Sequence, residues 1–312
     1  MDKKISIVVS VYNEEDSIPL FYPEVMKVLP DIGWDYELIF VNDGSADNSR
    51  AEIYKITQEN PRVKAIHFSR NFGHEAAMIA GIDHASGDGI ICLDADLQHP
   101  PALIGEIVKK LQDGYDVISM VRTRNESAGM IKNVTSSGFY SVINSVSTTK
   151  MQKNASDFFG ISARAADVLR NSYRERVRFL RGYVQMIGFR KTVIEYRAAD
   201  RAAGKSKYSI RKLFRFSMDT LVCFSDMPLH LGIYAGAVSA VLGLILLIYT
   251  IVTKVMRGAP SGYATIIVVI CFMFSVLFVL VGIIGVYIGV LFREIKGRPL
   301  YIVEETVNFE RK

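Results

Sequence analysis

Residues 5–15 have the sequence ISIVVSVYNEE, and this stretch is the clearest indication of the fold. Its first part, 5–11, is a short, nearly continuous apolar run rich in β-branched side chains. A run of this kind, ended at once by polar residues, is typical of a strand buried on both faces of a sheet. Four further runs have the same character: 36–41 (YELIFV), 63–68 (VKAIHF), 89–94 (GIICLD) and 116–121 (DVISMV).

Helical patterns fill the gaps between these predicted strands. They lie near residues 17–29, 47–59, 74–85 and 101–113. Regular alternation of strand and helix predicts an α/β domain with a mainly parallel sheet. Ligands of such sheets bind beyond the carboxyl ends of the strands, so the residues that follow each strand are the first candidates for a site.

Polar residues follow four of the five predicted strands, which favours one shared site over four unrelated loops. These groups are Tyr12-Asn13-Glu14, Asn42-Asp43-Gly44-Ser45, Ser69-Arg70-Asn71 and Asp94-Ala95-Asp96. They argue against a dinucleotide-binding domain, because the first strand is followed by two carboxylates and no glycine, where GxGxxG would meet a pyrophosphate. The phosphate-binding sequence GxxxxGK[ST] is also absent.

Asp94 and Asp96 are two residues apart at a strand end, so side-chain alternation predicts that both point to one side of the sheet. Gln98 continues the alternation. Hard divalent cations such as Mg²⁺ or Mn²⁺ prefer carboxylate and phosphate oxygens, so we expect Asp94, Asp96 and Gln98 to hold such an ion beside a phosphate ligand. His74 and His99 stand alone in the sequence, and we expect them to be structural.

Five stretches, in this order, resemble glycosyltransferase family 2. They are VVSVYNEE (8–15), FVNDGSADNS (40–49), FSRNFGHEAAMIAG (68–81), DADLQHPP (94–101) and RAAGKSKYSIRKL (201–213). The resemblance is to the polyprenyl-phosphate branch of the family, which includes dolichyl-phosphate mannose synthases and bactoprenol glucosyltransferases, and it covers nearly the whole chain. It implies a GT-A fold, a divalent metal ion and inversion at the anomeric carbon.

The resemblance also implies roles for individual residues. Tyr12, Asn13 and Glu14 would line the nucleotide pocket, Asp43 would contact the base or ribose, and Asp94, Asp96 and Gln98 would serve the metal ion and the diphosphate. Capping of the next helix is the alternative role for Glu14. Arg70 follows a buried strand, so we expect it to meet an anion of the donor, with a solvated surface charge as the alternative.

Two positions depart from the family pattern. Asn42 stands where the family often has a second aspartate, and we keep it among the donor-binding candidates. In Ser156-Asp157-Phe158-Phe159 the family more often has an arginine after Asp-Phe. We align Asp157 with the family's acidic residue near the transferred sugar, so Asp157 and Asp96 are our catalytic candidates.

The mean hydropathy of +0.21 is high for a soluble protein, and the excess lies in two long stretches of the C-terminal region that contain no charged residue. They lie between Asp226 and Lys254 and between Arg257 and Arg293. Each exceeds the roughly 20 apolar residues that cross a bilayer. Helices buried in a soluble core are usually shorter and have a polar edge. We therefore expect a catalytic domain over 1–200, a basic amphipathic juxtamembrane segment over 201–228, membrane spans over 229–253 and 264–292, an external loop over 254–263 and a cytosolic tail over 293–312.

Basic residues flank the two predicted spans unequally. Eight lie outside the span pair (Lys205, Lys207, Arg211, Lys212, Arg215, Arg293, Lys296 and Arg298), and two, Lys254 and Arg257, lie in the loop between the spans. The positive-inside rule predicts that both chain ends are cytoplasmic, so the protein would be a multi-pass protein of the plasma or inner membrane. Small residues, Gly285 with Gly289 and Ala235 with Ser239 and Gly243, predict close helix packing, either within the chain or in a homo-oligomer.

Taken together, these features predict transfer of a sugar from a nucleotide-sugar, such as UDP-glucose, to a polyprenyl phosphate. We expect Arg201, Lys205 and Lys207 of the basic segment, and Arg122 after the fifth strand, to bind the acceptor phosphate. That phosphate is already mostly a dianion at pH 7, because its second pKa is about 6, so Asp157 would orient the attack more than remove a proton.

Two other functions are open to a chain of this kind. Transferases that act on a sugar hydroxyl usually have a QxxRW-type motif, whereas this chain has a single tryptophan, Trp34, and no such motif. A membrane scaffold or lipid flippase without activity would not need carboxylates at the predicted site positions. The modest net charge of +5 is concentrated near the membrane segments, and we expect no nucleic-acid partner.

Overall fold

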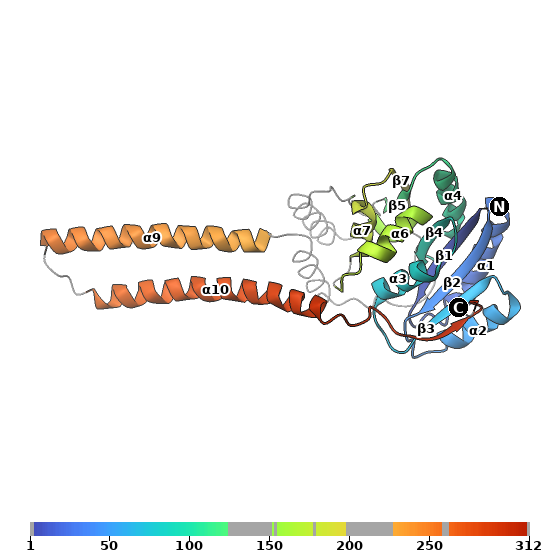
Figure 1. The fold of residues 1–312 in the computed structure, drawn as a ribbon, viewed down its shortest axis with the longest axis horizontal. Helices are drawn as coiled ribbons and strands as arrows, with labels where there is room; N and C mark the ends of the chain where they lie inside the picture. The colour runs from blue at the N-terminus through green and yellow to red at the C-terminus, as the bar shows by residue number, and fades with distance from the viewer. Residues whose placement is uncertain are drawn as a thin grey trace. The chain divides into compact units, whose positions relative to one another are not determined.

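The computed structural model describes residues 3–123, 152, 155–176, 179–197, 227–257 and 262–310. Two compact units make up the chain (Figure 1). The first contains every strand of the described residues, including one after Arg298, and the second contains two long helices. The segment 201–226, with Arg201, Lys205 and Lys207, lies outside the described residues.

The centre of the sheet is parallel, as predicted. It consists of β1 (Lys4–Val11), β2 (Asp35–Asn42), β3 (Val63–Phe68) and β4 (Gly89–Asp94), which adjoin in the order β4-β1-β2-β3. The helices that connect them are α1 (Ile18–Val28), α2 (Ser49–Glu59) and α3 (His74–His84), and α4 (Ile104–Gln112) follows β4 after a short 3-10 turn at Pro101–Leu103. These elements agree with the prediction to within two residues, except that the last predicted helix, 101–113, begins with the 3-10 turn.

Side-chain alternation along β1 explains how the helices cover the sheet. Ile5, Ile7 and Val9 belong to the core that also contains the buried residues of α1, α2 and α4. Val8 points to the other face, where α3 packs so closely that a Cβ on Gly81 would lie 2.0 Å from Val8 Cγ1. Gly81 thus lets α3 lie directly against β1, and the beginning of the helix lies beside the end of the strand, where His74 Nδ1 is 2.9 Å from Ser10 Oγ.

In the other half of the sheet one strand runs against its neighbours. The full strand order is β7-β5-β6-β4-β1-β2-β3-β8, with β5 (Val117–Arg122), β6 (Ala155–Ser162) and β7 (Lys191–Tyr196) at one end. The helices α6 (Ala163–Ser172) and α7 (Leu180–Met186) lie between β6 and β7 in sequence. β6 is antiparallel to both of its neighbours, β4 and β5. Its first residues therefore lie at the same edge of the sheet as the last residues of β4.

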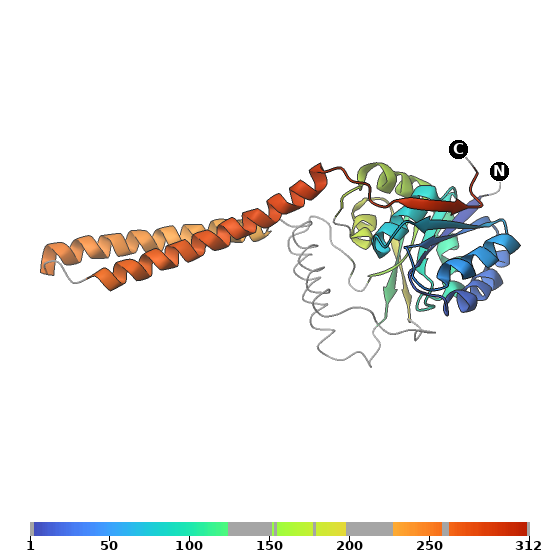
Figure 2. The ribbon, with the colours of Figure 1, turned by 90° about the horizontal axis from the view of Figure 1, so that it is seen from below.

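The strand β8 (Val303–Val307) closes the opposite end of the sheet, antiparallel to β3 (Figure 2). Arg50 of α2 forms ion pairs with Glu304 and Glu305, at 3.1 and 2.7 Å. The Tyr301 hydroxyl donates a hydrogen bond to Asp83 of α3 at 2.7 Å. Residues that follow the second apolar stretch thus belong to the same sheet as the N-terminal strands, whereas the sequence had predicted only a tail.

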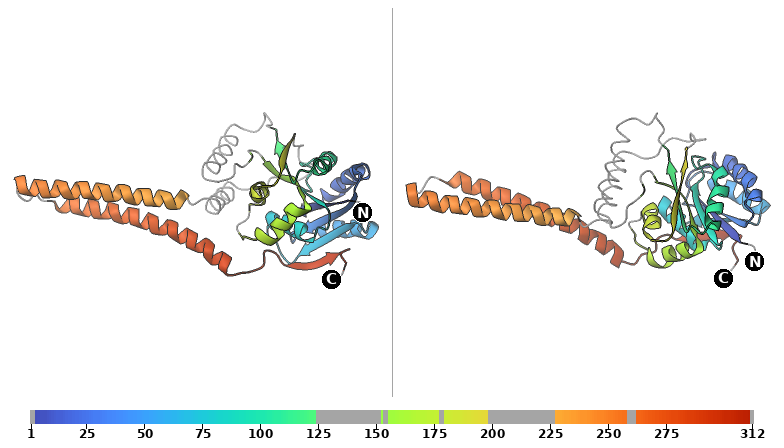
Figure 3. Two further views of the ribbon diagram at one scale, coloured as in Figure 1. Left: turned by 45° about the horizontal axis from the view of Figure 1, so that its top comes forward. Right: turned by 90° about the horizontal axis from the view of Figure 1, so that it is seen from above.

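The second unit consists of α9 (Met227–Arg257) and α10 (Tyr263–Ile295), which lie side by side (Figure 3). Each is long and apolar enough to cross a membrane, over Leu229–Tyr249 and Phe272–Ile295, and neither apolar stretch is buried. A Cβ on Gly232 would lie 2.9 Å from Leu280 Cδ2, so α9 contacts α10 there.

A buried carboxylate connects the first residues of three strands. Glu37 of β2 is 1% exposed, pairs with Lys64 and Lys4 at 2.7 and 3.1 Å, and accepts hydrogen bonds from Ser6 Oγ and the Ser86 amide. Burial alone would raise the pKa of Glu37, but these partners, Lys64 foremost, lower it to about 2.

We expect Glu37→Gln to lower the free energy of unfolding by about 3–5 kcal/mol at pH 7, because it leaves the partly buried ammonium groups of Lys4 and Lys64 without their carboxylate. The pKa of Glu37 is lower in the folded chain than its ordinary value of 4.5. Its contribution is therefore complete above about pH 4.5 and is lost as the pH falls towards 2. Unfolding of detergent-solubilised protein at pH 7 and pH 3 measures the difference. Glu24→Gln, in an exposed pair with Lys27, is the control. Equal effects of the two variants at pH 7 would refute this account.

Candidate active site

The loops after β1 and β2 are joined by hydrogen bonds of two predicted donor-binding residues, Asn13 and Glu14. The Asn13 amide donates to Ser45 Oγ at 3.0 Å, and Asn13 Oδ1 accepts from the Ala46 amide at 2.8 Å. The Glu14 amide donates to Ser49 Oγ at 2.8 Å, and the Glu14 carboxylate accepts from Ser17 Oγ. Tyr12 is 40% exposed beside them. The structure thus brings Tyr12, Asn13 and Glu14 to the carboxyl edge of the sheet together with the second loop.

Asn42 and Asp43 are buried, and their side chains hold loops. Asp43 Oδ1 and Oδ2 accept hydrogen bonds from the Phe72 and Gly73 amides, at 2.6 and 2.9 Å, and this fixes the loop after β3. Asn42 Oδ1 accepts from the Ser45 amide at 3.0 Å, and Asn42 Nδ2 lies 3.2 Å from His67 Nδ1. Both residues therefore fix the conformation of loops at the carboxyl edge of the sheet.

Arg70 is exposed on the loop after β3. Its guanidinium carbon lies 3.9 Å from the centre of the Phe72 ring, and Nη1 donates to the Asn71 carbonyl. Stacking on an aromatic ring holds a cation near the edge of the sheet without neutralising it. This position agrees with an anion-binding role for Arg70.

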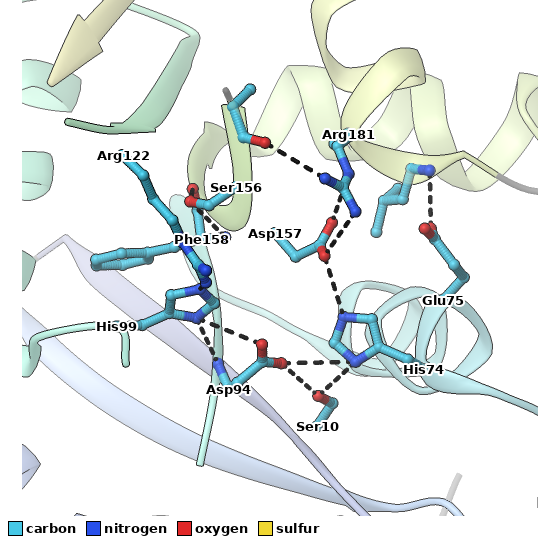
Figure 4. Close-up of polar contacts among 12 residues, drawn as sticks. Ser10, His74, Glu75, Asp94, His99, Arg122, Ser156, Asp157, Phe158 and Arg181 are labelled. Atoms are coloured by element: carbon cyan, nitrogen blue, oxygen red, sulfur yellow. Dashed lines mark hydrogen bonds and ion pairs between the residues drawn. The ribbon is translucent and has the colours of Figure 1, made fainter. Parts of the chain in front are cut away.

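Asp94, the last residue of β4, lies at the centre of the polar cluster in Figure 4. Ser10 Oγ donates to Asp94 Oδ1 at 2.9 Å, and His74 Nδ1 lies 2.9 Å from Ser10 Oγ and 3.5 Å from Asp94 Oδ1. The single hydroxyl proton of Ser10 goes to Asp94, so the contact with His74 requires a proton on Nδ1. His99 Nδ1 accepts from the Asp94 amide at 3.0 Å.

Asp157, in β6, faces the same cluster. His74 Nε2 lies 3.9 Å from Asp157 Oδ2, so the imidazole stands between the two carboxylates. Arg181 of α7 approaches Asp157 in two-point fashion, with Nε 3.0 Å from Oδ1 and Nη2 donating to Oδ2 at 3.0 Å. The structure therefore joins Asp94 and Asp157, which are 63 positions apart in the chain, through one histidine.

The electrostatics of this cluster agree with its geometry. Burial alone would lower the pKa of His74, but the carboxylates of Asp94 and Asp157 raise it above its ordinary value. Burial alone would raise the pKa of Asp94, but His74, His99 and the Ser10 hydroxyl lower it. Both shifts favour an imidazolium between two carboxylates.

Arg122, at the end of β5, contacts the ring nitrogen of His99 that does not face Asp94. Its Nε donates to the Tyr196 hydroxyl at 3.0 Å, and Nη2 lies 3.0 Å from His99 Nε2. The His99 ring is fully buried and stacks on Phe158 with 5.3 Å between ring centres. Burial lowers the pKa of His99, and the nearby Arg122 guanidinium adds to this effect.

One part of the predicted metal geometry is wrong. β4 ends at Asp94, and residues 95–99 form a turn in which Leu97 has a φ of +60°, so strand alternation does not extend to Asp96 and Gln98. The reason is local, because Asp96 Oδ1 accepts the Gln98 amide at 3.1 Å and this hydrogen bond bends the chain.

The carboxylate chemistry still fits a divalent cation. In the part of the chain that the structure describes, no three His, Cys, Asp or Glu side chains are grouped so that they could hold a metal ion. Mg²⁺ is commonly bound by only one or two carboxylates, with substrate phosphates and water as its other ligands. Asp96 is partly exposed at the turn that follows β4. Asp94 is tied to Ser10 and His74.

Four residues of the cluster were missed or undervalued in the sequence. Ser10 and Arg181 were not candidates, and His74 and His99 were expected to be structural, whereas both histidines contact Asp94. His74 begins α3 shortly after the polar residues that follow the third strand. This position is the signal by which the sequence could have identified it as a site residue. Arg181 follows no predicted strand, so no signal in the sequence marked it as a site residue.

Comparison with known proteins identifies the family to which this site belongs. The model of glycosyl transferase family 2 matches residues 6–170, which include Asp94 and Asp157. The chain belongs to glycosyl transferase family 2. It is therefore a glycosyltransferase, as the four N-terminal stretches predicted.

Relatives extend the match to the whole chain. An uncharacterised glycosyltransferase of Bacillus subtilis (strain 168) is 37% identical over 308 residues, which cover 98% of this chain and 95% of the relative. A prophage-derived bactoprenol glucosyl transferase of Shigella flexneri is 35% identical over 304 residues, which cover 97% of this chain and 98% of the relative.

Among solved structures, mannosyl-3-phosphoglycerate synthase from Rubrobacter xylanophilus matches with a TM-score of 0.50 at 12% identity, covering 70% of this chain and 72% of that one. This likeness bears on the fold alone. The predicted GT-A fold, followed by two apolar helices, is confirmed.

We expect Gly44→Ala to weaken nucleotide-sugar binding at least tenfold and to destabilise the fold by roughly 1–3 kcal/mol. Gly44 has a φ of +61°, and a Cβ there would lie 2.4 Å from the Arg70 carbonyl carbon, so the loops after β2 and β3 would separate. Calorimetric titration with nucleotide-sugars measures the affinity. The matched control is Gly105→Ala in α4, where a Cβ meets open space and stability should stay equal or rise slightly. Unchanged donor affinity in Gly44→Ala would contradict the assignment of these loops to the pocket.

Proposed function

We propose that this glycosyltransferase moves a sugar from a nucleotide-sugar to a polyprenyl phosphate, giving a polyprenyl-phosphate monosaccharide. The observation that carries the proposal is the presence, in one chain, of a family 2 site and two apolar helices of membrane-spanning length. A soluble donor and a lipid acceptor suit such a chain. The full-length similarity to a bactoprenol glucosyl transferase supports the same acceptor class.

The donor would bind across the first three loops. Tyr12, Asn13 and Glu14 lie in the first of these loops, and Asn42 and Asp43 anchor the second and third. Arg70 would meet the diphosphate from its exposed position on the third loop. We propose a UDP-sugar, with UDP-glucose as the first candidate. Support for this choice comes from family resemblance and from the glucosyl transferase named among the relatives.

A divalent cation, Mg²⁺ or Mn²⁺, would be held by Asp96, with Asp94 and Gln98 beside it and diphosphate oxygens completing its ligands. When bound, such an ion neutralises charge on the nucleoside diphosphate as it leaves. Chelating agents should then weaken donor binding as well as turnover.

The reaction would be a single displacement. An oxygen of the lipid phosphate forms a bond to the anomeric carbon, while the bond from that carbon to the diphosphate oxygen breaks and the nucleoside diphosphate leaves with the electron pair. The acceptor is mostly a dianion at pH 7 and needs no strong base. Asp157 contacts the Arg181 guanidinium through both oxygens, which supports a role in orienting the reacting groups.

Binding of the acceptor phosphate requires cationic side chains. Arg122 lies at the carboxyl edge next to Asp94, near enough to affect the pKa of that residue. We propose that Arg122 and the basic residues Arg201, Lys205 and Lys207 bind the phosphate of the lipid. Charge-assisted contacts of this kind are the strong ones among hydrogen bonds.

We also propose that α9 and α10 cross the membrane as a hairpin, with both chain ends in the cytoplasm. β8 follows α10 and pairs with β3, which precedes α9, so the segments flanking the two helices must be on one side. An even number of crossings meets this requirement, and the eight-to-two distribution of basic residues supports the same orientation. A reporter after Lys312 that reads external would contradict it.

The proposed function predicts a lipid-soluble radioactive product when purified full-length protein is given a polyprenyl phosphate, Mg²⁺ or Mn²⁺ and one of a panel of labelled nucleotide-sugars. We expect UDP-glucose to be the best donor. Chelation, or Asp96→Ala, should reduce turnover at least a hundredfold, because charge on the leaving diphosphate is then not neutralised.

Polyprenol, which has a hydroxyl in place of the phosphate, is the matched control acceptor and should give no product. Transfer to polyprenol or to a free sugar at a comparable rate would instead support a hydroxyl-directed transferase. Absence of any transfer across the full donor panel would remove the proposal.

A further inference from the structure

The first residues of α3 and α7 are joined to each other and to Asp157. α3 begins with His74 and Glu75, and α7 begins with Leu180 and Arg181. Glu75 Oε2 accepts a hydrogen bond from the Leu180 amide at 2.7 Å (Figure 4). His74 and Arg181 approach Asp157 from opposite sides. The contacts form a closed ring that runs from α3 to Asp157, on to α7 and back to α3.

The Leu180 amide requires an acceptor from outside its own helix. The first amides of any helix have no partner within it. Phe179, at the N-cap position, provides no side-chain cap, and Leu180 is only 2% exposed. A buried amide without a partner would be costly, and the Glu75 carboxylate supplies the hydrogen bond. Glu75 thereby fixes where α7 begins.

The start of α7 determines the position of the Arg181 guanidinium. Arg181 is the second residue of the helix, and Phe179, Leu180 and Tyr183 around it are buried. A planar guanidinium matches both oxygens of a carboxylate only in a narrow range of orientations. A shift of α7 would therefore break the two-point contact and let the Asp157 side chain rotate.

We infer that Glu75 and Arg181 form a positioning pair for Asp157: Glu75 fixes the start of α7, and Arg181 on that helix orients the Asp157 carboxylate towards the reacting groups. This inference rests on the proposed function, since it concerns the residue placed next to the transferred sugar.

The test uses full-length protein with single and double substitutions of the pair. Arg181→Ala should lower kcat tenfold to a hundredfold, and Glu75→Ala should lower it about tenfold, while the calorimetric affinity for the nucleotide-sugar changes less than twofold. Glu75→Gln should keep at least a third of the activity, because an amide oxygen still accepts the Leu180 hydrogen bond.

Two readouts separate positioning from a general structural role. The double variant Glu75→Ala/Arg181→Ala should be no slower than Arg181→Ala alone, since Glu75 acts through Arg181. Added guanidinium ion should restore part of the activity of Arg181→Ala. The matched control is Arg174→Ala, which removes an equally two-pronged pair with Asp83 at the other end of α3 and should change thermal stability without a matching loss of kcat.

Multiplicative losses in the double variant, no rescue by guanidinium, or unchanged kcat in Arg181→Ala would each overturn the positioning pair. These outcomes are distinct from failure of the proposed function. If the proposed function itself failed, the wild-type protein would not transfer sugar to polyprenyl phosphate.

Discussion

Two carboxylates, Asp94 and Asp157, share one partly buried edge of the sheet, and the rest of the site depends on keeping them there. Two neighbouring carboxylates repel each other, and burial makes this repulsion stronger. The protein places an imidazole between the two groups and a guanidinium beside Asp157. The raised pKa of His74 and the lowered pKa of Asp94 are two consequences of the same arrangement. An anionic donor and an anionic acceptor can approach such an edge because fixed cations already offset its negative charge.

Strand direction explains why the two carboxylates meet. The parallel strands β1, β2 and β4 end at one edge, and β6 begins there because it runs antiparallel between β4 and β5. Asp157 is the third residue of β6, so its side chain lies beside the end of β4 although the two are distant in sequence. The chain returns to the same sheet after the two apolar helices, because β8 follows α10 and pairs with β3. The chain therefore belongs to this sheet both before α9 and after α10.

Local patterns were enough to predict the central parallel strands and the polar loops that follow them. Runs such as 5–11 are apolar because both faces are covered, and they are recognisable without knowledge of any partner. What could not be predicted depends on contacts between distant segments. The insertion of β6 between β4 and β5, the reach of Arg181 to Asp157 and the return of β8 follow from tertiary packing. The alternation expected through Asp96 failed because a single hydrogen bond to the Gln98 amide ends the strand.

The central claim is that a lipid phosphate attacks the anomeric carbon directly, from the side opposite the departing diphosphate. The anomeric configuration of the purified lipid product tests this claim most directly, and NMR couplings at the anomeric position measure it. An α-linked donor such as UDP-glucose should give a β-linked sugar phosphate, with a coupling between the anomeric proton and phosphorus. An α-linked product would require two displacements and a covalent intermediate, and a product without the coupling to phosphorus would place the sugar on a hydroxyl. Either result would contradict the account.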